Sequence, residues 1–386
     1  MLKRLACVVL LLVGCGEPGG GDDQSSDTVT VTAPLAPDAV IAYRDGDGVW
    51  TTTMGATSPI VFTATSGSYT VAIVCPTQTP DIYQMTVGEL QTVVYDRECR
   101  TPGATLSGTV SGLMNRGMQV TWGQEPGSFW QSSGDTAPYS FTTPLGTRDL
   151  VATRGSVVTD RMIILRGLEI SGDAAVDLDF ESPTAITLEY PRITALGGGR
   201  LSSVGNTLVT AGGTSLGFGV GTENVAVVPE ASMGLDDLQV LSADGQGGVG
   251  TTVSVFGTSR AARVAVTTLQ LPQPITEIPL VSLIPAGAFV LPRVAWSAQP
   301  GAALYNIYVA GLRMHVSPAV FEVTNAVSGP DMSNVSGWDA NLGLPPGLRY
   351  SWSVGVVTVA PLEDALRSLP TREVEIRTSG WVGDVQ

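Results

Sequence analysis

Ser215 and His315 are the residues whose types come closest to nucleophilic chemistry. Ser215 lies in the run GTSLG (213–217), which satisfies the G-x-S-x-G pattern, and His315, the single histidine, follows it in serine-hydrolase order. A nucleophile elbow needs a sharp turn from a strand into a helix on a parallel sheet, and no helical rhythm surrounds Ser215. The run therefore predicts a glycine-rich β-turn and no catalytic residue. His315 is expected near the end of a strand, at the surface or at a sheet edge.

Metal binding has two candidates in the acidic residues. Asp45 and Asp47 alternate with glycines as at the start of a calcium loop, yet Ala56 stands where the twelfth position needs a glutamate. A hairpin turn explains this run, and whether calcium binds at Asp45 and Asp47 stays open. A single histidine cannot build an ordinary zinc site. No metal and no cofactor are expected, and a solvated strand face is expected at the acidic run Asp173, Asp177, Asp179 and Glu181.

Trp338 is the aromatic residue best placed to contact a ligand. It lies in the polar stretch SGPDMSNVSGWDANLG (328–343), and an exposed tryptophan can stack on a sugar ring. Trp122 is a further aromatic candidate. Trp50 and Trp130 recur at matching positions of a repeat, so they are expected to pack in cores.

The first residues are typical of an export signal. Lys3 and Arg4 precede an apolar stretch at 5–13, which is too short to span a bilayer. The following LVGC (12–15) resembles the lipobox of bacterial lipoproteins. That resemblance implies cleavage before Cys15, attachment of diacylglycerol to its thiol, acylation such as by palmitate, and stable anchoring to a membrane. Gly16 is not the aspartate that retains such proteins in the inner membrane, so the cell envelope, at the outer membrane, is the expected location.

Two cysteines remain once the signal and the acylated residue are set aside. Cys75 and Cys99 are then a pair in an exported chain, which predicts one disulfide.

The charge balance limits the partners. Loss of Lys3 and Arg4 with the signal would leave 18 basic residues, all arginine, against 35 acidic ones, and would change the formal net charge from -15 to -17. Such a chain is repelled by nucleic acids and by anionic lipid surfaces, so no nucleic-acid partner is expected.

The elements that must position these residues are almost all strands. Short alternating runs of Val, Thr and Ile are separated by Gly and Pro, and only residues 362–369 suggest a helical turn. Residues 15–37 are rich in Gly, Asp, Ser, Thr and Pro, which predicts a flexible tether. The predicted fold class is all-β, with tandem β-sandwich domains after a signal peptide and the tether.

An internal repeat lies in the first half. The run WTTTMGATSPIVFTATSGSYTV (50–71) matches WQSSGDTAPYSFTTPLGTRDL (130–150) at an offset of 79 residues with one gap, which predicts two copies of one β-domain. Arg154 and Ser182 stand opposite Cys75 and Cys99, so both halves of the disulfide are missing from the second copy together. Phrases such as SGSYTVAIVC and ATLSGTVSG are similar to carboxypeptidase regulatory-like β-sandwich domains. This implies a support or binding module without an active site.

The last segment has a firmer pattern. FVLPRVAWSAQPGAALYNIYVAG (289–311) and LGLPPGLRYSWSVGVV (342–357) resemble a fibronectin type III domain. The resemblance implies that Tyr350 makes a tyrosine corner, its hydroxyl bonding back to the backbone, and that Trp296 belongs to the core. Tyr350, Trp352 and Val354 alternate as one buried face of a strand should.

These patterns divide the chain into consecutive segments. A glycine-rich β-region of no assigned family separates the repeat from the last segment, and its role and the oligomeric state stay open. The predicted segments are a signal peptide (1–14), an acylated cysteine and linker (15–37), repeat 1 (38–100), repeat 2 (101–183), the glycine-rich domain (184–287) and the fibronectin type III-like domain (288–386).

The function predicted from these features is non-catalytic. We expect a membrane-anchored envelope lipoprotein that acts as a binding, adhesion or scaffold protein for an envelope protein or a glycan. A carbohydrate-binding surface protein is the alternative, and a hydrolase is the third hypothesis. The partner and the side of the membrane that the chain faces are not determined by the sequence.

Overall fold

The computed structural model confirms the all-β prediction. It describes residues 27–385 except 77, 100–101, 125–127, 131–133, 156–157, 198–199, 250–252, 264–267, 274, 276, 310–311, 336–342 and 368–369. Within this part of the chain nearly all regular structure is strand, with two short helices and two turns of 3-10 helix. Neither helix has both the length and the apolar character that crossing a membrane requires.

The first unit is a sandwich of a three-stranded and a four-stranded layer. The order β4-β1-β7 forms one layer, and β3-β2-β5-β6 forms the other. Valines and isoleucines on alternate positions of both layers meet in one core, as the period of two requires. The elements are β1 (Thr28–Thr32), β2 (Val40–Asp45), β3 (Thr51–Met54), η1 (Gly55–Thr57), β4 (Ile60–Thr63), β5 (Ser68–Val74), β6 (Asp81–Thr86) and β7 (Thr92–Val94).

The second unit has the same topology as the first. The order β11-β8-β14 corresponds to β4-β1-β7, with an antiparallel and a parallel neighbour in each case, and β10-β9-β12-β13 corresponds to β3-β2-β5-β6. Two copies of one unit would give this correspondence. The elements are β8 (Ala104–Ser111), β9 (Met118–Trp122), β10 (Ser128–Trp130), β11 (Ala137–Thr143), β12 (Gly146–Arg154), β13 (Arg161–Ile170), β14 (Ala174–Ala175), β15 (Leu178–Asp179) and β16 (Ile186–Thr187).

The glycine-rich region forms a four-stranded antiparallel arrangement with a small parallel pair beside it. The strand order is β19-β18-β20-β21, and β17 pairs with β22. One of its apolar clusters is shared with the second unit, because Val151 and Met162 pack with Leu208 and Phe218. The elements are β17 (Thr194–Gly197), β18 (Arg200–Val209), β19 (Ser215–Gly221), η2 (Glu230–Ser232), β20 (Leu238–Val249), β21 (Val253–Arg263) and β22 (Thr268–Leu271).

The last unit places three strands on four. The order β23-β24-β27 forms the smaller layer, and β29-β28-β25-β26 forms the larger one. Tyr350, Trp352 and Val354 lie together in the core between them, as the alternation predicts. The elements are β23 (Leu280–Ala286), β24 (Phe289–Ala295), β25 (Leu304–Val309), β26 (Leu312–Val316), α1 (Pro318–Thr324), β27 (Ala326–Ser328), β28 (Tyr350–Val359), α2 (Leu362–Leu366) and β29 (Val374–Val385).

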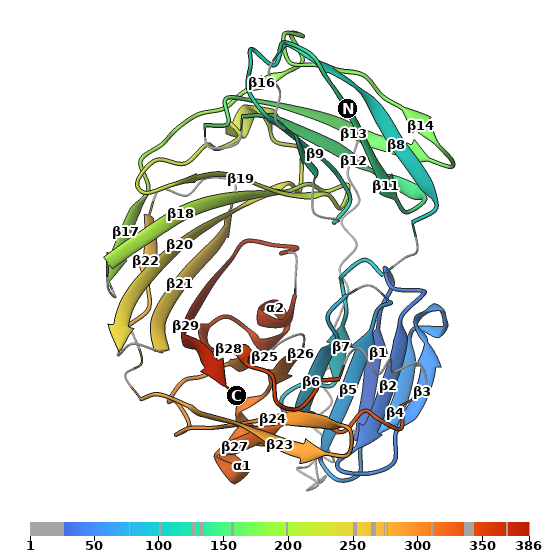
Figure 1. The fold of residues 1–386 in the computed structure, drawn as a ribbon, viewed down its shortest axis with the longest axis vertical. Helices are drawn as coiled ribbons and strands as arrows, with labels where there is room; N and C mark the ends of the chain where they lie inside the picture. The colour runs from blue at the N-terminus through green and yellow to red at the C-terminus, as the bar shows by residue number, and fades with distance from the viewer. Residues whose placement is uncertain are drawn as a thin grey trace, which may run out of the picture.

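One twelve-stranded sheet connects three of these units. Its order is β19-β18-β20-β21-β29-β28-β25-β26-β6-β5-β2-β3. The units therefore follow one another around a closed path, and the last unit returns to the first at the bottom of Figure 1. The closing contact is a parallel pairing of β26 with β6, in which Arg313 lies opposite Asp81 and His315 opposite Tyr83.

The covering layer changes face where β26 meets β6. In the first unit the strands β4, β1 and β7 cover the face that carries Tyr83 and Met85. In the last unit β23, β24 and β27 cover the opposite face, which carries Ile82 and Met314. In the described part of the chain, the strands of the first unit and those of the last unit therefore carry their second sheet layer on opposite faces. Helix α1 lies beside one of these faces and α2 beside the other.

Candidate functional site

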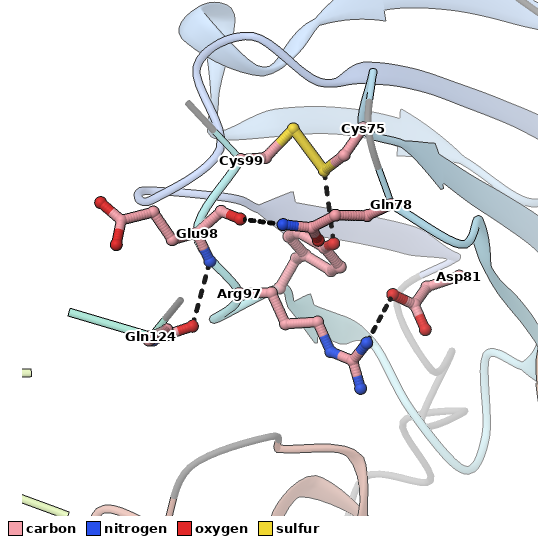
Figure 2. The surroundings of a disulfide bond; sticks show 8 residues. Cys75, Gln78, Asp81, Arg97, Glu98, Cys99 and Gln124 are labelled. Carbon is pink, nitrogen blue, oxygen red and sulfur yellow. Dashed lines mark hydrogen bonds and ion pairs between the residues drawn. A yellow bond between two sulfur atoms is a disulfide. The ribbon is translucent and has the colours of Figure 1, made fainter. Parts of the chain in front are cut away.

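The predicted disulfide is present at the end of β5. Cys75 and Cys99 are joined with their Cα atoms 5.6 Å apart, and both side chains are buried. Figure 2 shows the bond beside Gln78 and Glu98. The Gln78 amide donates to the Glu98 carbonyl oxygen at 2.7 Å, and the Tyr95 hydroxyl lies 3.5 Å from the Cys75 sulfur. The bond therefore holds the segment at 95–99 against the end of β5.

That segment also contacts the second unit. The Glu98 backbone N–H donates to the Gln124 side-chain oxygen at 3.0 Å, and the Gln124 amide donates to the Asp96 carbonyl oxygen at 2.8 Å. Arg148 lies 3.4 Å from the Glu98 carboxylate, whose side chain is 3% exposed. The disulfide thus stabilises the position at which the second unit meets the first.

Asp81 is the charged centre of the joint between β6 and β26. Its side chain is 1% exposed. Arg97 approaches one carboxylate oxygen to 3.4 Å, and Arg313 approaches the other to 3.1 Å. A buried carboxylate is stable only with such compensation, so these two arginines offset the burial of Asp81 at the joint.

The prediction that His315 lies at the surface or at a sheet edge is wrong. It is 8% exposed, and β26 runs between β25 and β6, so neither side of the strand is free. Its Nδ1 lies 2.8 Å from the Asn306 side-chain oxygen, its Nε2 lies 3.4 Å from Asp81, and its ring stacks on Tyr83 at 4.9 Å. The prediction failed because β6, more than 230 residues away in sequence, covers what would otherwise be an edge.

A polar groove of about 520 Å³ lies beside the joint, on the face that α1 adjoins. It is lined from the first unit by Arg44, Asp47, Thr70, Gln84 and Thr86 among others, and from the last unit by α1 and by the segment Ala326 to Asp331. The Gln84 amide donates across the groove to the Ser328 carbonyl oxygen at 3.0 Å. The groove therefore exists only when the two units are joined.

Trp50 contacts two residues of the groove lining, Arg44 and Asp331, but is not itself a lining residue. Its indole N–H donates to the Asp331 carbonyl oxygen at 3.0 Å, and the Arg44 guanidinium lies 4.7 Å above its ring. Burial lowers the pKa of Arg44. Trp50 is half-buried against the core of the last unit, so the expected core packing is only partial.

None of the other tryptophans predicted as contact or core residues is among the described residues that line the groove. Trp122 is buried in the second unit. The side chain of Trp130 and the whole of Trp338 and Cys15 lie outside the part of the chain that the structure describes.

Ser215 begins β19 in an antiparallel hairpin. Its strand pairs with β18 through the turn 210–214, so the glycine pattern belongs to a β-turn and not to a strand-to-helix elbow. The Thr214 hydroxyl bonds to the Asp149 carbonyl oxygen and accepts the Gly123 N–H at 3.0 Å. The turn therefore docks the glycine-rich region on the second unit.

Asp45 and Asp47 lie where β2 leads toward β3. Asp45 accepts hydrogen bonds from the Thr65 hydroxyl at 2.7 Å and from the Ser66 N–H at 2.9 Å, and it also bonds to the Ser66 hydroxyl. The Ser66 and Thr65 hydroxyls lower the pKa of Asp45. A cation would have to displace these donors. Asp47 points into solvent.

The acidic run of the second unit has a role that the sequence did not show. Asp173 and Asp177 are exposed, as a solvated face predicts, and their carboxylates in addition accept the backbone N–H groups of Thr105 and Thr109, each at 2.7 Å. These N–H groups belong to β8, beside which β14 and β15 pair only in short stretches. The carboxylates complete the bonding of that strand edge.

Arg154 replaces the disulfide in the second copy. It is the last residue of β12, the strand that corresponds to β5, and its side chain is 5% exposed. Its guanidinium bonds to both oxygens of Asp160 at 2.9 Å, to Glu181 at 2.8 Å and to the Gly112 carbonyl oxygen at 2.6 Å. Glu181 is the neighbour of Ser182, the counterpart of Cys99. An ion pair therefore joins the same two places that a covalent bond joins in the first copy.

The residues that sequence reasoning missed are Asp81, Arg97 and Arg313. The one local sign of Asp81 is that it is a charged residue in DIYQMT, a strand that is otherwise buried. No local pattern pairs it with Arg313. Comparison with models of known protein families and with curated proteins finds no match. The geometry of the chain itself therefore carries the functional argument.

Proposed function

We propose that the protein is a non-catalytic binding or scaffold protein of the cell envelope, tethered by lipid on Cys15. The signal-like start and the LVGC run support the anchor. The Cys75–Cys99 disulfide fits an exported chain, because such bonds persist in oxidising compartments.

The observation that carries the binding role is the joint between the first and last units. Parallel pairing of β6 with β26 closes the chain on itself, and the groove beside it takes its lining from both units. Because two packed units hold this surface, its polar groups have a fixed arrangement. Less conformational entropy is then lost when a partner binds. The groove is therefore our candidate contact surface for an envelope partner.

The resemblance of the last unit to fibronectin type III domains supports a binding or scaffold role. Its three strands pack on four, and the Tyr350 hydroxyl donates to the Pro345 carbonyl oxygen at 2.5 Å, as a tyrosine corner would. Trp296 is buried and stacks on Phe321 with ring centroids 3.8 Å apart.

Site-specific photo-crosslinking tests the groove. A photoreactive phenylalanine analogue is placed at Ser328, an exposed residue of the groove lining, and at Ser140, an exposed residue of β11, as the matched control. Irradiation of intact cells should give a covalent adduct from position 328 and none from position 140. Adducts at both positions or at neither would contradict a partner in the groove.

The anchor is tested by Cys15→Ser. The variant should lose labelled fatty acid and leave the membrane fraction, because no second anchor is proposed. Processing and fractionation identical to the parent chain would contradict the proposal.

Carbohydrate binding is the alternative, and the groove with Trp50 adjacent to its lining favours it. Arg44, Thr70 and Gln84 are polar residues of the lining, and the Arg44 guanidinium lies over the half-buried indole. A few placed polar groups beside apolar surface are typical of small-molecule sites. Envelope polysaccharides should then change the tryptophan fluorescence, and Trp50→Phe or Trp338→Ala should remove that change. An unchanged spectrum at saturating polysaccharide would exclude this alternative.

A further inference from the structure

A second cavity lies beside the joint, on the face opposite the groove. It has a volume of about 370 Å³ and is separate from the groove in all its lining residues. Its lining includes Arg97, Asn306, Tyr308, Arg313, Ser353 and Arg367.

The change of covering layer explains why the cavity forms here. In the last unit β23, β24 and β27 cover the face that carries Met314 and Val354. The alternate residues Tyr308, Arg313 and Ser353 face the other way and line the cavity. Helix α2 and the segment that the disulfide holds close the sides, and they contribute Arg367 and Arg97.

The lining is positively charged in a chain whose formal net charge is -15. Three arginines and the single histidine line the cavity, and no Asp or Glu is among the lining residues that the structure describes. The carboxylate beneath it, Asp81, is 1% exposed and is shared by Arg97, Arg313 and His315. One buried negative charge cannot neutralise three arginines, so an excess of positive charge faces the cavity.

Arg367 is the lining arginine whose guanidinium remains available for a ligand. It forms no ion pair with any residue that the structure describes, whereas Arg97 and Arg313 both contact Asp81. Guanidinium groups bind carboxylates and phosphates through planar, paired N–H donors, and low-dielectric walls strengthen such contacts. Asn306 and Ser353 add polar groups, and Tyr308, 39% exposed, offers a ring surface.

We propose that this cavity binds the oxyanion group, carboxylate or phosphate, of a small ligand or of an acidic saccharide. Arg97, Arg313 and Arg367 hold the anion, and the body of the ligand lies along Tyr308. The site goes beyond the partner contact proposed for the groove and does not depend on it, because the two share no lining residue.

Calorimetric titration of the purified chain tests the site. The probes are inorganic phosphate, D-glucuronate and, as the neutral control, D-glucose. Phosphate or glucuronate should bind and glucose should not, and the stronger of the two identifies the anion. Added salt should weaken binding, since the contact is electrostatic.

Arg367→Gln is the diagnostic variant, because it removes a lining charge without unpairing Asp81. It should weaken anion binding about tenfold, the loss expected for one charge-assisted hydrogen bond. Arg349→Gln is the matched control, since Arg349 pairs with Asp384 on an exposed surface of the same unit, and it should bind like the parent. Absence of binding by both anions, or equal binding by the Arg367 variant, would overturn the proposal.

Discussion

Two residues at equivalent strand ends close the two sandwich copies by different chemistry. Cys75 does so through the disulfide to Cys99, and Arg154 does so through Asp160 and Glu181. A covalent bond acts mainly by restricting the unfolded chain, whereas a buried ion pair depends on each partner being present. The two closures should therefore respond differently to substitution and to pH.

Removal of the disulfide should lower the stability of the first unit. The double variant Cys75→Ser with Cys99→Ser opens a loop with a sequence separation of 24 residues. Loop entropy assigns such a bond roughly 3.5 kcal/mol, and the urea-unfolding midpoint should fall accordingly. Reductant should produce the same fall in the parent and none in the variant. Equal midpoints for parent and variant would contradict a stabilising role.

Arg154→Met should destabilise the second unit by about 3 kcal/mol, because it leaves the Gly112 carbonyl oxygen without its donor and leaves Asp160 with only Arg116 as an ion-pair partner among the described residues. Arg192→Met is the matched control. Its pair with Glu223 is exposed, so its loss should cost less than about 1 kcal/mol. Urea unfolding of both variants measures the difference, and equal costs would contradict the assignment.

The same ion pair predicts a pH dependence. Burial alone would raise the pKa of Asp160, but the hydrogen bonds and charge of Arg154 outweigh it and lower the pKa. A carboxylate with a lowered folded-state pKa stabilises the fold above its unfolded value of about 4 and loses that contribution as the pH falls. Arg154→Met should flatten the acid limb of a plot of stability against pH. An unchanged acid limb would show that Asp160 does not provide it.

At the scale of elements, β8 depends on a close approach that only glycine permits. A Cβ on Gly108 would lie 2.0 Å from the Val176 carbonyl oxygen and 2.9 Å from the Tyr139 ring. That carbonyl accepts the Tyr139 hydroxyl at 2.7 Å, so strand, ring and covering segment meet at one point.

Gly108→Ala should therefore destabilise the second unit by about 2 kcal/mol, the cost typical of overpacking. Gly88→Ala is the matched control, because nothing lies within 4 Å of the added methyl group there. Thermal unfolding of the two variants should separate them clearly. A melting temperature for the Gly108 variant equal to that of the Gly88 variant would refute the close approach.

At the scale of the molecule, the pairing of β26 with β6 protects two sheet edges at once. The N–H of Arg313 donates to the Pro80 carbonyl oxygen at 3.1 Å, and the N–H of Ser317 donates to Gln84 at 3.0 Å. Without the first unit these donors of β26 would be unpaired, and an exposed edge of this kind pairs with other chains.

Deletion of residues 28–100, which removes β1 to β7, should consequently cause self-association, measured as mass by light scattering after size exclusion. Adding Arg313→Pro to the deleted chain should restore the monomer, because proline removes an outward N–H from the new edge. A monomeric deletion variant without the proline would show that β26 needs no cover.

The amount of structure predictable from sequence differs between these scales. The alternation of Tyr350, Trp352 and Val354 predicted a buried strand face, and the leftover cysteines predicted their bond; both are confirmed. The candidate sites were not predicted. Asp81 and Arg313 are 232 residues apart, and no local pattern relates them.

The sequence by itself determined the all-β class, the buried faces of strands and the disulfide, because these follow from a period of two and from cysteine chemistry within a short loop. Only the tertiary structure decided that the last unit returns to the first, which face each layer covers, and therefore where the groove and the basic cavity lie. The alternation of apolar residues predicts which side chains are buried. It does not predict which distant strand will pair with the edge of a sheet. That choice depends on shape and charge complementarity between residues far apart in the chain.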